Sequence, residues 1–296
     1  MIEKLKTFGD LKENVSFKTL STYRIGGLCR YLSEPHSLED FVSLLDYLRE
    51  ENIQHKVIGL GSNILFSDLD YDGVVVKTQK ALNKIEIKDD LVIAQAGVSL
   101  IKLAHQCVNA QKGGLEFASG IPGTLGGALF MNAGAYQKSM YDMVNRVLVY
   151  RNHELKWLNR EDIKVDYRYS SFMEEKETLI CAAELSVHPC DPIEAKKIMN
   201  DRLERRLSSQ PLDLPSCGSV FRNPYPELSW HLIESVGLRG YQIGDAQISL
   251  KHANFIVNLG QAKASDVIEL IELVQKKVFE KHGIHLVREV ELFNFL

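Results

Sequence analysis

Glycine is concentrated in one stretch of the chain where a backbone could close around a negatively charged ligand. Seven of the 20 glycines lie in this stretch, at positions 113, 114, 120, 123, 126, 127 and 134. Glycine has no Cβ, so the main chain can approach a ligand closely and successive N–H groups can converge on a phosphate. A lone Gly-x-x-Gly is usually a turn, but the density of glycine and the apolar residues between favour a phosphate or cofactor site over residues 120–136.

A second glycine-rich loop, GLGSNIL at residues 59–65, follows an apolar segment that is typical of a strand. It is not the dinucleotide fingerprint, because residue 64 is isoleucine, and it is not a P-loop, because no Gly-Lys-Ser/Thr follows. Two such loops would suit a ligand that has a diphosphate and two ends.

A polar segment bracketed by prolines, residues 214–224, contains the candidate reactive groups Ser216, Cys217 and Ser219. An ordinary turn is the alternative interpretation of this segment. Cys217 would be a nucleophile only beside a histidine or a positive charge that lowers its pKa. The order of residues along the chain does not place such a group there.

Two charged residues have ambiguous surroundings. Arg168 lies between two tyrosines, so it is either an ordinary exposed arginine or a buried clamp for a carboxylate. Glu289 lies on the mixed face of a predicted strand over residues 284–293; such a carboxylate is usually solvated, but one directed into a cleft would be held rigidly, as catalysis requires. The nine histidines are scattered, with no His-Glu-x-x-His, and no acidic cluster has ligand spacing, so we predict no metal site.

The elements that must position these residues alternate between helical and strand patterns, which predicts an α+β fold. Apolar periodicity and capping residues give the expected elements. These are a helix from the cap Ser37 to about residue 51, a helix from Ser99 to the glycines at 113 and 114, antiparallel strands over 146–158 and 179–187, a helix that begins at Pro192 after the cap Asp191, a helix from the cap Ser265 to about Gly283, and a strand over 284–293.

Length and composition limit the class of protein. At roughly 150 residues per domain, 296 residues suggest about two domains, and we place the boundary at residues 189–192. The 35 basic and 39 acidic residues leave a net charge of −4, which excludes a general nucleic-acid binder. No apolar run reaches about 18 residues, so no membrane span is predicted. Five cysteines without a Cys-x-x-Cys pair, together with an early charged N-terminus, indicate a cytoplasmic protein.

Taken together, the motifs resemble those of the UDP-N-acetylenolpyruvoylglucosamine reductase family, and the resemblance covers nearly the whole chain. Any one of them would be weak evidence, but all of them occur in the order typical of the family. They are TYRIGG at 22–27, the loops at 59–65 and 120–136, YR-x-S at 167–170, QP at 210–211, PS-x-GSVF at 215–221 and S-x-x-H-x-x-FIVN at 249–258. The spacing between Arg168 and Ser219 resembles that of the shorter, type II subgroup.

The resemblance implies a fold and a cofactor. Residues 1–190 would form an FAD-binding domain of the p-cresol methylhydroxylase/vanillyl-alcohol oxidase type, with subdomains over about 1–78 and 79–190, and residues 191–296 would form an α+β substrate-binding domain. FAD would be bound non-covalently. The residues expected to contact it are Gly59, Gly61, Ser62, Asn63, Ile121, Pro122, Gly123, Thr124, Gly126, Gly127 and Asn132. Gln137, at the end of the second loop, stands where the family usually has glycine.

The resemblance also implies a reaction. NADPH would reduce the flavin and leave, and the enolpyruvyl ether of UDP-N-acetylglucosamine would then be reduced to UDP-N-acetylmuramate for peptidoglycan synthesis. Arg168, Ser219 and Glu289 fall on the catalytic positions, and Tyr167, Arg168 and Asn223 on substrate-binding positions. Arg168 would stabilise charge on the substrate carboxylate, and Ser219 would donate a proton to C2. Glu289, if burial raises its pKa so that it is a neutral acid, would donate a hydrogen bond to the same carboxylate. A monomer is expected.

Two other functions remain open. The first is an oxidase of a hydroxy acid or sugar on the same flavin scaffold; such enzymes often attach the flavin through histidine or cysteine, and the two loops contain no histidine. The second is a catalytically idle nucleotide-binding or regulatory module, against which the presence of Arg168, Ser219 and Glu289 argues. Oxidation of NADPH that depends on the enolpyruvyl sugar would distinguish the three.

Overall fold

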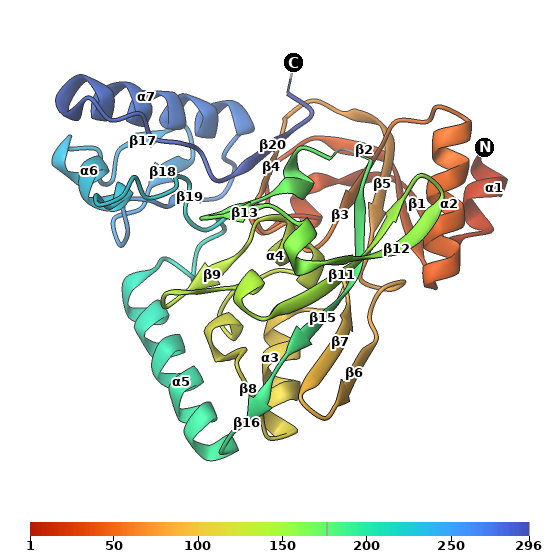
Figure 1. Ribbon diagram of the computed structural model, residues 1–296. Helices are drawn as coiled ribbons and strands as arrows, with labels where there is room; N and C mark the ends of the chain where they lie inside the picture. Colours follow the sequence, from red (N-terminus) through yellow and green to blue (C-terminus); the bar gives the residue numbers. More distant parts are fainter. Residues whose placement is uncertain (176, 296) are drawn as a thin grey trace. The chain divides into compact units, whose positions relative to one another are not determined.

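The computed structural model describes residues 1–175 and 177–295, and these pack into two compact units (Figure 1). Unit 1 comprises Met1–Glu13, Tyr31–Leu60 and Gly73–Glu204, and unit 2 comprises Asn14–Arg30, Gly61–Asp72 and Arg205–Leu296. The first glycine-rich loop is therefore divided between the units after Leu60. These compact units are made of segments from different parts of the chain, so they do not test the domain boundary expected at residues 189–192, which stays a prediction.

The helices begin largely where the sequence has a capping residue. Ser37 Oγ accepts the N–H of Asp40 at 3.0 Å at the start of the second helix, and Ser99 caps the third in the same way. Asp191 accepts an N–H from the first turn of the fifth. The α-helices of the described residues are α1 (Ile2–Lys6), α2 (Leu38–Glu50), α3 (Leu100–Asn109), α4 (Leu125–Phe130), α5 (Pro192–Ser209), α6 (Ser229–Ser235) and α7 (Ala264–His282). Single 3₁₀ turns lie at Phe17–Thr19, Glu116–Ala118, Met140–Asp142, Arg160–Asp162 and Ser171–Met173.

The strands are mostly short, and many are connected by tight turns. They are β1 (Gly9–Ser16), β2 (Leu28–Pro35), β3 (His55–Ile58), β4 (Ile64–Phe66), β5 (Tyr71–Lys77), β6 (Ile85–Lys88), β7 (Leu91–Gln95), β8 (Lys112–Gly113), β9 (Gly134–Ala135), β10 (Lys138–Ser139), β11 (Val144–Arg151), β12 (Glu154–Asn159), β13 (Val165–Asp166), β14 (Tyr169–Ser170), β15 (Leu179–Ser186), β16 (His188–Pro189), β17 (Gln242–Ile243), β18 (Ala246–Ile248), β19 (Ile256–Asn258) and β20 (Glu291–Phe293). Mixed helices and sheets confirm the predicted α+β class.

A five-stranded antiparallel sheet with the order β12-β11-β15-β7-β6 forms the centre of unit 1 (Figure 1). The antiparallel strands predicted over 146–158 and 179–187 are confirmed as β11, β12 and β15. Buried side chains of this sheet, such as Val92 and Val147, share one hydrophobic core with Leu103 and Cys107 of α3. The core fixes the end of β7. Ala96, directly after this strand, accepts a hydrogen bond from Gly126 of the second glycine-rich loop.

A second core of unit 1 lies around α2. Phe41 and Leu45 of α2 are fully buried with Leu5 of α1 and with Val74 and Val76 of β5. β3 pairs in parallel with β5, within a four-stranded sheet of order β1-β2-β5-β3. Burial of a leucine or phenylalanine side chain contributes about 1.5–3 kcal/mol, so this apolar stripe accounts for the position of α2 against the sheet.

Unit 2 consists of a small sheet, a long helix and a parallel strand pair. β17, β18 and β19 form an antiparallel sheet, and α7 packs on it, as Figure 1 shows in blue. β4 pairs in parallel with β20 over Ile64–Phe66. Val267, Ile271 and Val274 of α7 share a buried core with Val290 and with Leu65 of β4. The loop before β4 is thereby held beside the C-terminal segment.

Three predicted elements differ from the structure. The helix expected to run from Ser99 to the glycines at 113 and 114 ends at Asn109, and Gly113 lies in strand β8. The strand predicted over 284–293 is wrong for most of its length, because only Glu291–Phe293 form a strand; the preceding residues make a single bridge, between Arg288 and Phe221. The last helix begins at Ala264, so Ser265 lies inside it, and the carboxylate of Asp68 accepts the N–H groups of both residues at 2.8 and 3.1 Å. The predicted end near Gly283 is confirmed, because this residue is left-handed with φ 68°.

Candidate functional site

The second glycine-rich loop is fixed against the end of β7 in unit 1. The N–H of Gly126 donates to the carbonyl of Ala96 at 2.8 Å, and a Cβ on Gly126 would lie only 2.9 Å from the Ala96 Cβ. Thr124 begins α4, and its Oγ1 accepts the N–H of Gly127 at 3.3 Å. The loop residues Ile121, Pro122 and Gly123 lie between the 3₁₀ turn at Glu116–Ala118 and this cap.

The start of the first loop meets the second loop inside unit 1. A Cβ on Gly59 would lie 2.3 Å from Oγ1 of Thr124, so glycine lets the main chain at residue 59 lie this close to the Thr124 side chain. The side chain of Gln79 donates to the carbonyl of Gly59 at 3.2 Å. Its Oε1 is buried and has no hydrogen-bond partner among the described residues. Unpaired buried polar atoms are rare in native proteins, so this one indicates a place for a ligand or water.

The remainder of the first loop belongs to unit 2. Gly61 has φ +68°, and a Cβ there would lie 2.2 Å from the carbonyl oxygen of Leu20. The N–H of Thr22 donates to the carbonyl of Gly61 at 3.2 Å. Beside this contact, Ser21 Oγ is buried and has no hydrogen-bond partner in the described part of the chain. Glycine is therefore required at 61 both for its conformation and for space.

Asn63 connects the first loop to the segment that carries Glu289. Its side-chain amide donates to the carbonyl of Glu289 at 3.0 Å, and its own carbonyl accepts the N–H of Glu291 at 2.9 Å. The two bonds hold the main chain on both sides of Val290, which is 3% exposed. A residue predicted to contact a cofactor thus fixes the backbone of a predicted catalytic residue.

Ser219 lies in a loop that the same segment holds. Gly218 precedes it with φ +77°. The carbonyl of Val220 accepts the N–H of Glu289 at 2.8 Å, so the loops of Ser219 and Glu289 run side by side. The side chain of Asn254 accepts the N–H of Phe221 at 3.0 Å and donates to its carbonyl at 2.8 Å.

Asn254 is a positioning residue that sequence reasoning missed. It lies inside the motif at 249–258, and its backbone carbonyl also accepts the N–H of Val220 at 2.9 Å. An asparagine with no predicted role inside a recognised motif was the available signal. A side-chain amide can donate and accept at the same time, so Asn254 can bind both the N–H and the carbonyl of Phe221.

Cys217 is a structural thiol rather than an activated nucleophile. It is 4% exposed, its Sγ–H donates to the carbonyl of Ile64 at 3.2 Å, and burial raises its pKa to about 12. Thr22 Oγ1 donates to the carbonyl of the preceding residue, Ser216, at 2.7 Å. Both bonds tie the Ser219 loop to the first glycine-rich loop and to the segment that supports it.

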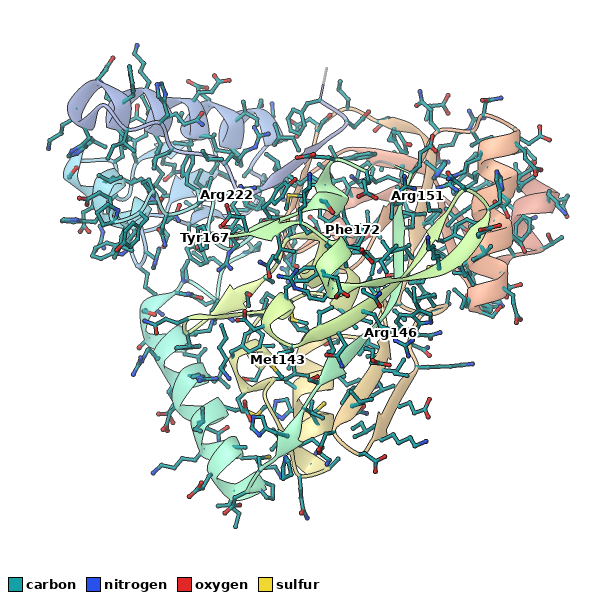
Figure 2. The ribbon with its side chains drawn as sticks, in the orientation of Figure 1. Met143, Arg146, Arg151, Tyr167, Phe172 and Arg222 are labelled. Atoms are coloured by element: carbon teal, nitrogen blue, oxygen red, sulfur yellow. The ribbon has the colours of Figure 1, made fainter. Side chains whose placement is uncertain are left out.

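Arg168 lies at the turn of the β13–β14 hairpin in unit 1. Its neighbour in that turn, Tyr167, is labelled in Figure 2. Arg168 has φ +55°, and its guanidinium carbon lies 5.1 Å from the ring centroid of Tyr167. Its Nη2 donates to the carbonyl of Gly134 at 2.6 Å. The arginine is therefore held in a strained conformation by a ring on one side and a backbone carbonyl on the other, which fits the predicted clamp better than a freely exposed side chain.

The side chains of Asn132 and Asn223 make hydrogen bonds to the main chain. Asn132 is buried, and its amide donates at 2.8 Å to the carbonyl of Asp166 in the hairpin that carries Arg168. Asn223 Oδ1 accepts the N–H of Ser229 at 3.0 Å at the start of α6. Each asparagine thus supports a candidate site segment, and their contacts with cofactor and substrate stay predictions.

The residues present fit a ligand with a diphosphate. In unit 1, Gly59 and Gly126 allow close approach of the main chain, and the unpaired buried Oε1 of Gln79 belongs to the residue that contacts Gly59. In unit 2, Gly61 allows the same approach beside the unpaired buried Oγ of Ser21. Residues 1–175 and 177–295 contain no group of three or more His, Cys, Asp or Glu side chains placed to hold a metal ion. Among the helices described, none is both long and apolar enough to cross a membrane.

Comparisons with known proteins match both parts of the chain. Residues 30–152 match a family described as an FAD binding domain, and residues 210–293 match the C-terminal domain of UDP-N-acetylenolpyruvoylglucosamine reductase. The reductase of Caldanaerobacter subterraneus is 41% identical over 296 residues, covering 99% of this chain and 97% of that protein. The reductase of Thermotoga maritima is 44% identical over 284 residues, covering 94% and 98%.

A solved structure agrees with these matches. The crystal structure of the reductase from Thermus caldophilus superposes with a TM-score of 0.81 at 30% identity, covering 96% of this chain and all of that one. Identity of this level over nearly the full length of several reductases, together with the two matched domains, confirms the predicted fold and the predicted resemblance. The chain belongs to the UDP-N-acetylenolpyruvoylglucosamine reductase family, whose members join an FAD-binding domain to a C-terminal domain of their own.

Proposed function

We propose that this chain reduces the enolpyruvyl double bond of UDP-N-acetylenolpyruvoylglucosamine to give UDP-N-acetylmuramate, using FAD and NADPH. The family supports the substrate and the cofactor. The observation that carries the proposal is the arrangement in unit 2, where Asn63 of the first glycine-rich loop, the loop of Ser219 and the backbone of Glu289 are joined by hydrogen bonds. The monomeric state stays a prediction.

The glycine-rich loops would hold FAD through their backbones. Bound there, FAD would accept hydride from NADPH and supply it to C3 of the enolpyruvyl group. Gly59, Gly61, Asn63, Thr124 and Gly126 are proposed to contact it. The further residues proposed to contact it are Ser62, Ile121, Pro122, Gly123, Gly127 and Asn132.

The three proposed catalytic side chains match the charge that develops on the substrate. Addition of hydride at C3 leaves negative charge at C2, which spreads into the adjacent carboxylate. Arg168 would stabilise that charge, and one such preorganised donor contributes about 3–4 kcal/mol in known enzymes. Glu289, in its neutral, protonated form, would donate a hydrogen bond to the same carboxylate. Ser219 Oγ–H would donate its proton to C2, which completes the saturated ether, and would regain a proton from solvent.

A test separates the two halves of this reaction. In Ser219→Ala, NADPH should still bleach the bound flavin, because that step does not use the serine. Re-oxidation of the reduced protein by the enolpyruvyl sugar should be about 10²- to 10⁴-fold slower, as is typical for loss of a proton donor. Both rates can be measured by stopped-flow absorbance of the flavin.

Ser216→Ala is the matched control, since its hydroxyl lies in the same loop and its carbonyl, not its side chain, makes the hydrogen bond to Thr22. This control should re-oxidise at the unmodified rate. Equal re-oxidation rates in both variants would refute the role of Ser219. A protein whose oxidation of NADPH did not depend on the enolpyruvyl sugar would refute the proposed function itself.

A further inference from the structure

We propose that Arg222 binds a negatively charged group of the substrate, beside Glu289; this rests on the function proposed above. The backbone of Arg222 is fixed at both ends. Its N–H donates to the carbonyl of Val287 at 2.9 Å, and its carbonyl accepts the hydroxyl of Ser229 at 2.6 Å. Arg222 is labelled in Figure 2.

The guanidinium of Arg222 is partly buried without a partner. Its Nε is inaccessible to solvent and has no hydrogen bond, and the group makes no ion pair with any described residue. Arg206, Arg239 and Arg288 of the same unit all pair their Nε, with Gln210, Glu234 and the carbonyl of Val290. Because a buried charged donor without an acceptor is costly, this one is better explained by an acceptor that arrives with a ligand.

Strand geometry places Arg222 on the same face as Glu289. Phe221 and Arg288 are directly opposed in an antiparallel bridge, and the hydrogen bonds on either side of it, from Arg222 to Val287 and from Glu289 to Val220, are those of a non-hydrogen-bonded pair. Side chains alternate along each segment. Arg222 and Glu289 therefore lie together on the face opposite to Phe221.

That face is accessible at the end where Arg222 lies. Val287, directly across from Arg222, is 55% exposed, whereas Val220, directly across from Glu289, is 2% exposed. The outer nitrogens of the guanidinium are not among the buried atoms that lack a partner, so they reach solvent. A ligand can thus approach the outer nitrogens while the inner one stays shielded.

A guanidinium in this setting selects a carboxylate or a phosphate, to which it can donate two parallel hydrogen bonds. The proposed substrate carries both groups, a carboxylate on the enolpyruvyl ether and a diphosphate between the sugar and the uridine. The shared chemistry is an oxyanion, and two ligands distinguish the sources. UDP-N-acetylglucosamine has the diphosphate alone, and the enolpyruvyl sugar has both groups.

The experiment titrates the oxidised, FAD-loaded protein with each ligand by calorimetry, in the absence of NADPH so that no turnover occurs. Arg222→Gln should weaken binding of the enolpyruvyl sugar about 10- to 100-fold, the range for loss of a charge-assisted hydrogen bond. Weaker binding of both ligands identifies the diphosphate as the partner; weaker binding of the enolpyruvyl sugar alone identifies the carboxylate. Arg222→Lys, which keeps the charge but not the planar fork, should be intermediate.

Arg239→Gln is the matched control, because this substitution removes the same charge from the same unit. Arg239 already forms an ion pair with Glu234 at the surface. A thermal melt separates binding from structure: loss of Arg222 should leave the melting temperature unchanged or raise it, whereas a structural arginine would lower it. Unchanged affinity of Arg222→Gln for both ligands, with the unmodified protein binding normally, overturns the assignment. Failure of the unmodified protein to bind either ligand would instead overturn the proposed function.

Discussion

Replacement of Gly59 by alanine is expected to force apart the two glycine-rich loops of unit 1 and to weaken FAD binding. The new Cβ would lie 2.3 Å from Oγ1 and 3.2 Å from Cβ of Thr124. Non-bonded carbon atoms are most favourable at about 3.5–4.0 Å, so the loops must separate by about 1 Å. Thr124 cannot rotate away freely, because it is 3% exposed and its Oγ1 accepts the N–H of Gly127.

Two magnitudes follow from this contact. Overpacking of a well-filled interior costs about 1–3 kcal/mol, so the free energy of unfolding should fall by that amount. If the displaced loop loses one hydrogen bond to the diphosphate, about 1.5–3 kcal/mol of binding energy is lost, which is about a 10- to 100-fold rise in Kd for FAD. Urea unfolding measures the first, and titration of the apoprotein with FAD, followed by flavin fluorescence, measures the second.

Gly260→Ala is the matched control, because Gly260 is not among the residues proposed to contact FAD. Its Cβ would approach only Oδ2 of Asp245, at an ordinary 3.5 Å. Adding Thr124→Ala to Gly59→Ala removes the oxygen that the new Cβ contacts, so the effects of the two substitutions should be less than additive. The reasoning is refuted if Gly59→Ala unfolds at the same urea concentration as the unmodified protein and binds FAD as tightly as Gly260→Ala does.

Four further outcomes are expected. Asn63→Ala removes the 3.0 Å hydrogen bond to the carbonyl of Glu289, so re-oxidation by the enolpyruvyl sugar should slow about 10-fold while reduction by NADPH changes less. Stopped-flow absorbance measures both rates, and an equal decrease of the two would contradict this expectation. Cys190 is the one cysteine that is not buried, so a thiol reagent should label it first in the native protein. Burial raises the pKa of Cys217 from 9.0 to about 12, so the contribution of this thiol to stability is present below pH 9 and is lost as the pH rises toward 12. Urea unfolding measured across this pH range would show the loss. Gln137, with φ +61° in the β9–β10 turn, should be replaceable by glycine with a gain of about 1 kcal/mol in unfolding free energy, and a lower melting temperature would contradict this.

Elements that depend on local signals could be predicted from the sequence. The caps at Ser37 and Ser99 and the left-handed Gly283 satisfy helix ends with neighbouring atoms, so residue type and position suffice to locate them. Gln137 shows the same logic, because Tyr136 and Gln137 both have positive φ, as a two-residue hairpin turn of type I′ requires. Glycine, which the resemblance leads us to expect at this position, would therefore suit the backbone better.

Elements that depend on distant partners could not be predicted. Alternation of Leu286, Val290 and Leu292 predicted one continuous strand, but this segment has two different partners. Its first part pairs once with the loop of Phe221, and its last part pairs with β4, far away in the sequence. The observed start of α7 differs from the predicted start for the same reason. The acceptor for its first N–H groups is Asp68, far away in the sequence, rather than a residue next to the helix.

The candidate site shows the same division. The motifs located the loops of Gly59 and Ser219, but no local pattern could show that Asn63 lies against Glu289, 226 positions later in the chain. Nor could it show that the first glycine-rich loop serves both units, with Gly59 against Thr124 in one and the rest of the loop in the other. Such contacts are fixed by strand pairing between remote segments, which apolar periodicity does not encode.

The pairing of β4 with β20 therefore has a consequence for the chemistry. Two hydrogen bonds hold the main chain of Glu289: its carbonyl accepts from the side-chain amide of Asn63, and its N–H donates to the carbonyl of Val220. Its backbone cannot shift without loosening either the first glycine-rich loop or the loop of Ser219. A catalytic group needs this kind of support, because displacement of reacting groups by about 1 Å can cost about 10²-fold in rate. Asn63, the loop of Ser219 and Asn254 are thus parts of one hydrogen-bonded framework within unit 2, and substitution of Asn63 or Asn254 should shift the carboxylate of Glu289 without altering that residue.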